Sequence, residues 1–174
     1  MAHLGFTARF GILLAGLVLA FGAVAPGSAL AKAGGSDLPF KGSVTGTSVH
    51  NLVTGQLDAV SAGKLTHLGR ATLEQQALIL IIGTPPNHTL DVSGTWTLTA
   101  ANGDKLSGTS AGIGTPTDAT HITLVIEYTA TGGTGRFANA SAEFTATFYH
   151  HQYLLELPVS YGEHVAMLDG HLSW

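Results

Sequence analysis

The 174-residue chain contains no cysteine and few charged side chains. Without cysteine no disulfide can form, so stability has to come from packing and sheet hydrogen bonds. Lys, Arg, Asp and Glu make up 10% of the residues, and the 11 acidic side chains outnumber the 7 basic ones. This balance argues against nucleic acid and anionic membrane surfaces as partners. We expect no nucleic-acid binding, and no membrane insertion once the N-terminal segment has been removed.

Helical periodicity is also missing, because no window after the first thirty residues keeps apolar residues at three-four spacing. Short alternating segments with turn signals between them are typical of an all-β sandwich or barrel. No linker and no long repeat interrupts the pattern, which predicts one domain.

The N-terminal segment has the features of a signal peptide. An apolar run over 11–24 follows Arg9, and it has the length of a signal-peptide core but is short for a membrane span. The small-x-small pattern Ala29-Leu30-Ala31 predicts a signal peptide over 1–31, with Ala33 as the alternative cleavage point. A retained anchor is the other interpretation. We expect a secreted or periplasmic protein.

The mature chain begins with a Gly/Ser-containing stretch, 32–39, that is typical of a flexible terminus. The β domain then spans 40–174. Alternation and turn signals predict ten strands: 40–50, 55–62, 64–74, 76–82, 89–100, 105–112, 121–129, 141–151, 154–158 and 164–174. Asn102-Gly103 is the strongest hairpin signal, because both residues accept positive φ.

The stretch 131–148 gives the clearest strand and turn pattern. Three glycines, Gly132, Gly133 and Gly135, predict a turn, and Arg136 follows them. Beyond the turn, Ala142, Phe144, Ala146 and Phe148 share one face of a strand whose other face is polar. The segments 76–82 and 121–129 are apolar on both faces, which suggests a covering loop or a second subunit. We therefore expect self-association into a homo-oligomer.

Residues 131–140 (TGGTGRFANA) resemble the GGTG-[RK]-F-x-x-A motif of plant dirigent proteins and, more loosely, the matching segment of allene oxide cyclases. Residues 66–71 and 101–106 are similar to segments of small secreted bacterial proteins with an allene-oxide-cyclase-like barrel. The resemblance implies a calycin-like antiparallel β-barrel of about eight strands around an apolar cavity, so that some of the ten segments merge. Residues for phenoxy-radical coupling or fatty-acid epoxide cyclisation cannot be matched to positions in this chain, so fold alone is implied.

Histidine is the residue type considered first for metal binding or catalysis. Strand parity places His67, His150 and His164 on the inward face. There they could ligate zinc or copper, or polarise a substrate carbonyl. The alternative is that each is a hydrogen-bonded residue of the core. No close ligand spacing such as HExxH occurs, and His150 and His151 face opposite sides of a strand. We expect no metal and no cofactor.

A hydrolase is not supported. Asp169, His171 and Ser173 share a face, but neighbours two apart in a strand lie about 7 Å from each other, too far for a triad. No G-x-S-x-G elbow occurs. The catalytic candidates are His67 and Glu127. If the Glu127 side chain points into the barrel, it could act as a general acid or base; if it points outward, it is an ordinary solvent-exposed residue.

The remaining candidates concern packing. Arg136 and Arg70 are expected to pair with carboxylates, with Glu127, Glu143 and Glu74 as possible partners. The aromatic side chains could line a ligand cavity or simply fill the core. These are Trp96, Tyr128, Phe144, Phe148 and Trp174.

Two hypotheses about function follow. The preferred one is a secreted, non-catalytic barrel that binds a small apolar molecule or serves as a structural module. The alternative is a cyclase or isomerase of the dirigent and allene oxide cyclase type, acting on a small hydrophobic substrate. Ionisable groups that converge in an open pocket would favour the enzyme, whereas a core filled by aromatics and Leu would argue against it. A metal binder using His67, His150 and His164 is a third, weaker idea.

Overall fold

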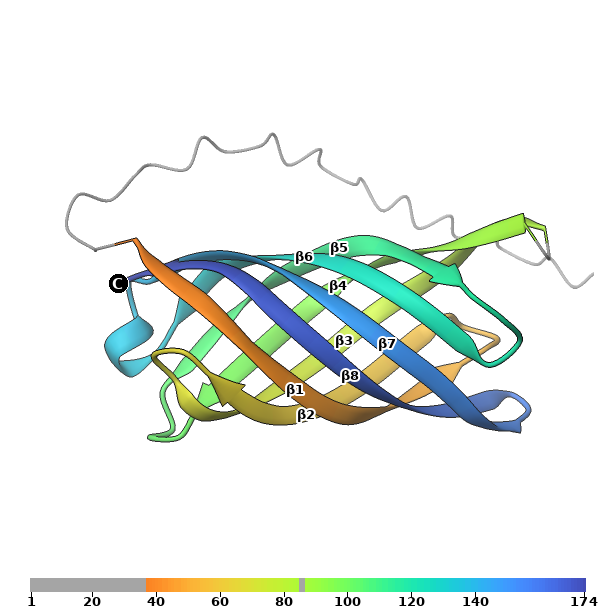
Figure 1. Cartoon of the computed structure of the whole chain (residues 1–174), viewed down its shortest axis with the longest axis horizontal. Helices are drawn as coiled ribbons and strands as arrows, with labels where there is room; N and C mark the ends of the chain where they lie inside the picture. The colour runs from red at the N-terminus through yellow and green to blue at the C-terminus, as the bar shows by residue number, and fades with distance from the viewer. Residues whose placement is uncertain (1–36, 85–86) are drawn as a thin grey trace, which may run out of the picture. The chain divides into compact units, whose positions relative to one another are not determined.

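The computed structural model describes residues 37–84 and 87–174 of the chain. The expected signal peptide, 1–31, lies outside the described residues. The described residues form a closed barrel of eight antiparallel strands, each paired with the next and β8 with β1 (Figure 1). The strands are β1 (Leu38–Asn51), β2 (Gln56–Leu65), β3 (Gly69–Thr84), β4 (Asn87–Ala100), β5 (Lys105–Pro116), β6 (His121–Gly133), β7 (Ser141–Glu156) and β8 (Val159–Ser173). None of the described residues forms a helix long and apolar enough to cross a bilayer.

The predicted fold class, a single antiparallel barrel of about eight strands, is confirmed. The ten predicted segments merge into eight because two boundaries were wrong. The chain turns at 66–68, inside the predicted strand 64–74, and joins the remainder of that segment to 76–82 as β3. The predicted strand 154–158 is instead the end of β7 and its turn into β8. β1 starts at Leu38, two residues before the expected start.

Burial follows the alternation of the strands. On β4, Val92, Trp96 and Leu98 are buried, while Asp91, Ser93 and Thr95 are exposed. The predicted inward row of β7, from Ala142 to Phe148, is buried in the same way. The outer face is rich in Thr and Ser, as expected for a wall with one wet side.

The two ends of the barrel differ. At one end, here called the closed end, the short 3₁₀ helix η1 (Gly135–Phe137) inserts Phe137, which is fully buried. Trp174 packs edge-on against Phe137 with the ring centroids 5.7 Å apart. The opposite end, the open end, carries the connections β1–β2, β3–β4, β5–β6 and β7–β8. Figure 1 shows η1 and the last strand's terminus together at the closed end.

The glycine turn differs in detail from the prediction. β6 continues through Gly132 and Gly133, and within this turn only Gly135 has positive φ, at 56°. Its position beside Asp104 leaves no space for a Cβ. Asp104 is also the carboxylate partner of Arg136, with Nε and Oδ2 3.7 Å apart. Arg136 also donates from Nη2 to the carbonyl of His67 at 2.9 Å, so it links two connections of the closed end.

The expectation that glutamates pair with the two arginines was therefore wrong for Arg136. Among the described residues Arg70 forms no ion pair. The Asn102-Gly103 hairpin is confirmed, because it joins β4 to β5 and Gly103 has φ of 87°.

Glycine at inward positions lets the eight strands curve tightly. A Cβ on Gly63 would overlap the carbonyl oxygen of Ser43 on the neighbouring strand, so no other residue fits this position. Gly132 also lies on a strand, but a Cβ there would meet nothing within 4 Å.

Alanine substitutions at Gly63 and Gly132 can be compared to test whether the curvature of the barrel requires glycine at position 63. Gly63→Ala should lower the free energy of unfolding by about 3 kcal/mol, because the added methyl has to push two strands apart. Gly132→Ala should change it by less than about 0.5 kcal/mol. Urea unfolding of both variants measures the difference, and equal stabilities would contradict the steric role of Gly63.

Candidate functional site

A cavity of about 50 Å³ lies inside the barrel at the open end. Six polar side chains line one side, all from the adjacent strands β7, β8 and β1. They are Ser48, His50, His150, Gln152, Ser160 and His164. Aliphatic side chains of β3, β4 and β6 line most of the other side, where Gln75 of β3 is the polar exception. The aliphatic residues are Ile79, Leu90, Ile122, Leu124 and Ile126. The cavity therefore has a histidine wall and an aliphatic wall.

Closure of the barrel builds the histidine wall. His150 of β7 lies directly opposite His164 of β8, and their rings are stacked at 6.2 Å between centroids. β8 in turn pairs with β1, where Ser160 lies opposite His50. The three histidines are separated by up to 114 positions in sequence but belong to three neighbouring strands.

Two glycines make room for the histidine rings. A Cβ on Gly162 would overlap the ring of His150, so this glycine is what allows the imidazole to lie across β8. A Cβ on Gly46 would lie 2.7 Å from Ser61 Oγ. Gly46 of β1 lies between its two cross-strand partners, His164 of β8 and Ser61 of β2. Because glycine has no side chain, the side chains of His164 and Ser61 can meet over it.

Ser61 Oγ and His164 Nε2 form a buried hydrogen bond of 2.7 Å. The pair has the atoms of a nucleophile and its base, but Ser61 is buried and does not line the cavity. The bond therefore orients His164 and satisfies two buried polar groups. The row Asp169, His171 and Ser173 lies on the outer parity of β8, with Asp169 paired to Lys41 and Ser173 to Ser141. It forms no triad, as expected.

All three cavity histidines are biased toward the uncharged form. Burial lowers the pKa of His164 to about 4, with a smaller effect of nearby His150. Burial also lowers the pKa of His150, assisted by repulsion from His151 and His50, and burial alone lowers that of His50. At neutral pH the wall thus presents imidazoles that both donate and accept hydrogen bonds.

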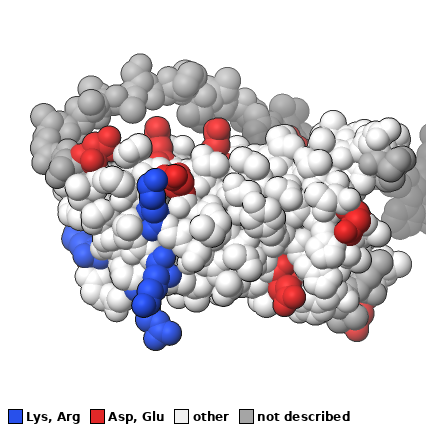
Figure 2. All heavy atoms as spheres, viewed as in Figure 1, with Lys and Arg blue, Asp and Glu red and all other residues white. Residues whose placement is uncertain are grey.

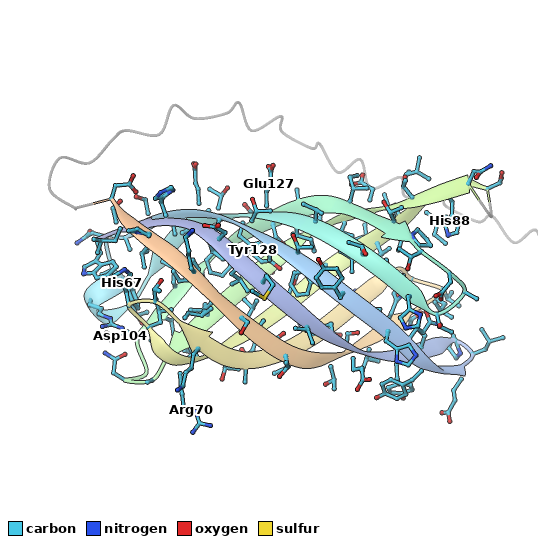
Figure 3. The ribbon with its side chains drawn as sticks, in the orientation of Figure 1. His67, Arg70, His88, Asp104, Glu127 and Tyr128 are labelled. Atoms are coloured by element: carbon cyan, nitrogen blue, oxygen red, sulfur yellow. The ribbon has the colours of Figure 1, made fainter. Side chains whose placement is uncertain are left out.

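One fully buried polar atom of the wall has no hydrogen-bond partner among the described residues. Nε2 of His50 is buried and makes no hydrogen bond, which leaves it free for a ligand atom or for water. Nδ1 of His88, on β4 near the open end, is in the same condition but does not line the cavity (Figure 3).

Below the cavity the barrel is filled. Trp96, Tyr128 and Phe144 contact one another, with Tyr128 and Phe144 stacked at 4.8 Å. The Tyr128 hydroxyl donates to Gln75 Oε1 at 2.7 Å, and Gln75 in turn reaches Ser110. The polar groups of this network are paired with one another, and Gln75 also lines the cavity.

The predicted aromatic cavity is therefore largely wrong. Of its five members only Phe148 lines the cavity. Trp96, Tyr128 and Phe144 are core, because they are buried and their rings pack against one another inside the barrel. Trp174 lies at the closed end and is 39% exposed.

The two catalytic candidates lie away from the cavity. Glu127 is on the outer face of β6 and exposed, whereas its neighbour Tyr128 points inward (Figure 3). His67 was expected on the inward face, and that was wrong, because it occupies the β2–β3 turn with φ of 66° and is exposed. It lies at the closed end beside Trp174.

The metal candidates divide in the same way. His150 and His164 face inward as predicted, but His67 lies at the other end of the barrel. His50 is the third histidine of the cavity and was not singled out from the sequence, although it has the inward parity of Phe40, Val44 and Ser48. Within residues 37–84 and 87–174 no group of three His, Asp or Glu side chains is arranged to hold a metal ion.

Charge is distributed unevenly along the barrel. The five Lys and Arg of the described residues, Lys41, Lys64, Arg70, Lys105 and Arg136, all lie in or near the closed-end connections. Figure 2 shows them gathered over that half. The open end carries acidic residues instead, including Asp118, Glu156 and Glu163. The mouth of the cavity thus favours uncharged or cationic molecules over anions.

Comparison with known proteins gives no relative. No protein-family model, no curated protein and no solved structure matches the chain.

The buried histidines predict a loss of stability in acid. The unfolded chain protonates His164 below its ordinary pKa near 6.5, whereas the folded protein resists until about pH 4. The free energy of unfolding should therefore fall as the pH drops from 6.5 to 4, by about 3 kcal/mol from His164 alone. Urea unfolding at pH 7.5, 5.5 and 4 tests this. His164→Gln should flatten the profile, and an unchanged profile would contradict the assignment.

Proposed function

We propose that the barrel is a binding protein for a small, uncharged molecule with an apolar body and one hydrogen-bonding group. The observation that carries the proposal is the two-sided cavity, which places uncharged imidazoles opposite aliphatic side chains. A ligand with both characters satisfies the unpartnered His50 nitrogen and keeps the aliphatic wall dry.

The size of the cavity limits which part of a ligand enters. About 50 Å³ holds about four water molecules or the end group of a longer molecule. The loops around the mouth expose apolar side chains, among them Leu52, Val53 and Leu157. We infer that a hydroxyl or carbonyl end enters the cavity and that an aliphatic remainder lies against this rim.

The acidic open end argues for an uncharged end group. A carboxylate in the cavity would lose its water without gaining a cation, since the described Lys and Arg all lie toward the closed end. 1-Hexanol and hexanoate have the same chain length and differ in this charge, which makes them suitable probes.

The proposal predicts that 1-hexanol binds at pH 7.5 and that hexanoate binds at least tenfold more weakly. Methyl NMR of Ile122, Leu124 and Ile126 reports entry into the cavity directly. His50→Leu should weaken 1-hexanol binding about tenfold, the equivalent of about 1.4 kcal/mol for one lost hydrogen bond. His171→Leu, on the outer face of β8, is the matched control and should leave binding unchanged.

The proposal fails if these methyl signals do not shift at millimolar 1-hexanol, or if hexanoate binds as tightly. Preserved thermal unfolding of His50→Leu shows that a loss of binding is local. His50 suits this test because it forms no hydrogen bond that the substitution would break.

The second candidate is an isomerase or cyclase acting on a small hydrophobic molecule, the class implied by the dirigent and allene oxide cyclase resemblance. Three uncharged imidazoles that converge in one pocket favour it, because each can accept a proton from a bound carbonyl compound. Exchange of the α-protons of 2-butanone in D₂O, followed by NMR, tests this. Acceleration over buffer that is lost in His150→Gln would support catalysis, and no acceleration leaves binding alone.

A further inference from the structure

A second pair of histidines lies on the outside of the barrel near the open end. His121 of β6 and His151 of β7 are direct partners across the strands. Their rings are nearly parallel, with an angle of 12° and 4.6 Å between centroids. Their side chains are 52% and 41% exposed, so both rings reach solvent.

Each ring has a carboxylate near its Nδ1 atom. His121 Nδ1 lies 2.9 Å from an oxygen of Asp118 in the β5–β6 connection. His151 Nδ1 lies 3.6 Å from Glu163 Oε1 on β8. The two carboxylates lie on different sides of the histidine pair. Each ring therefore has its own carboxylate partner.

Asp118 is a fixed anion. Its carboxylate accepts hydrogen bonds from the backbone N–H groups of Thr120 and His121 as well as from the His121 ring. These bonds fix the carboxylate in place beside the His121 ring.

A carboxylate at Nδ1 determines the chemistry of the other ring nitrogen. In His121 the Nδ1 proton is donated to the Asp118 carboxylate, and the lone pair is left on Nε2. At His151 the Glu163 carboxylate is too distant for a hydrogen bond, but its negative charge favours a proton on the nearer nitrogen, Nδ1. In the described residues neither Nε2 has a hydrogen-bond partner. Metal-binding histidines have this arrangement, in which an outer carboxylate orients the ring and makes its free nitrogen more basic.

We propose that His121 and His151 form a surface site for a divalent transition-metal ion, ligated by the two Nε2 atoms, with water completing the coordination. Imidazole nitrogens suit Zn²⁺, Cu²⁺ and Ni²⁺, whereas Ca²⁺ and Mg²⁺ require oxygen ligands. Two nitrogens bound at about 2.0–2.1 Å lie closer together than the present ring separation. A small rotation of each exposed side chain brings them together, and the acidic open end attracts the cation.

The site differs from the metal arrangement considered from the sequence, which combined His67, His150 and His164. It uses neither His67 nor the cavity pair His150 and His164. It is also independent of the proposed ligand cavity, because His150 and His151 lie on opposite sides of β7. Two protein ligands give an exchangeable site, in keeping with the lack of any three-residue metal group in the described part of the chain.

Zn²⁺ is the probe for the test, carried out on the full chain by calorimetric titration at pH 7.5. The wild type should bind one Zn²⁺ per barrel. His121→Gln and His151→Gln should each weaken binding at least tenfold, and the double variant should be no weaker than the singles, because both nitrogens serve one ion.

Two further variants separate ligation from other effects. His171→Gln removes another exposed histidine, on β8, and should leave the Zn²⁺ affinity unchanged. Glu163→Gln keeps the shape but removes the charge at His151 Nδ1, and should weaken binding about tenfold. Ring ¹⁵N NMR should show the Nε2 signals of both residues shifting together on addition of Zn²⁺.

The proposal is overturned if either single variant binds like the wild type, if His171→Gln costs as much as the pair, or if only one Nε2 signal responds. All variants lie on the exposed surface, and thermal unfolding without metal should be nearly unchanged. Saturating Zn²⁺ should raise the unfolding temperature of the wild type and not of the double variant, since it binds only the folded pair.

Discussion

Pairing of the first strand with the last is the constraint on which the rest of the structure depends. β1 and β8 are in register from Leu38 opposite Leu172 to Asn51 opposite Val159. This ladder joins segments more than 100 residues apart and removes the two free edges that an open sheet would expose. It also fixes the circumference, and so decides how much side-chain volume the interior accepts.

The two ends of the barrel interior are filled by different kinds of side chain. Toward the closed end large rings interlock, and their few polar atoms are paired with one another, as in the contact of Tyr128 with Gln75. Toward the open end aliphatic side chains and imidazoles replace most of the aromatic rings, and a buried nitrogen of His50 is left without a partner. A buried polar atom costs free energy unless a ligand or water satisfies it, so the two ends of the interior differ in how far their buried polar atoms are satisfied.

The alternation of the sequence was enough to predict the fold class and most side-chain directions. It placed Trp96, Phe148 and His164 inside and the Thr-rich rows outside, because period-two alternation is a local property. The break at 66–68 was missed because the turn residue, His67, adopts positive φ without being Gly or Asn. The histidine wall could not be predicted in full, because the strands of His50 and His164 become neighbours only when the barrel closes.

The same limit applies to the ion pairs and the external histidines. Asp104 was not considered for Arg136, because the two meet through separate connections at the closed end. His121 and His151 depend on the register of β6 with β7, and a shift by one residue would move one of them to the inside. Contacts of this kind require the three-dimensional register and not only the pattern.

The barrel begins and ends at its closed end, where the start of β1 lies beside the end of β8. The open end is made entirely of internal connections. A tether, a fusion partner or an attachment to a solid support can therefore be joined to Trp174 without covering the cavity mouth or the external histidines. Immobilised in this way, the barrel would stand on its filled end and present its hollow end to the surrounding solution.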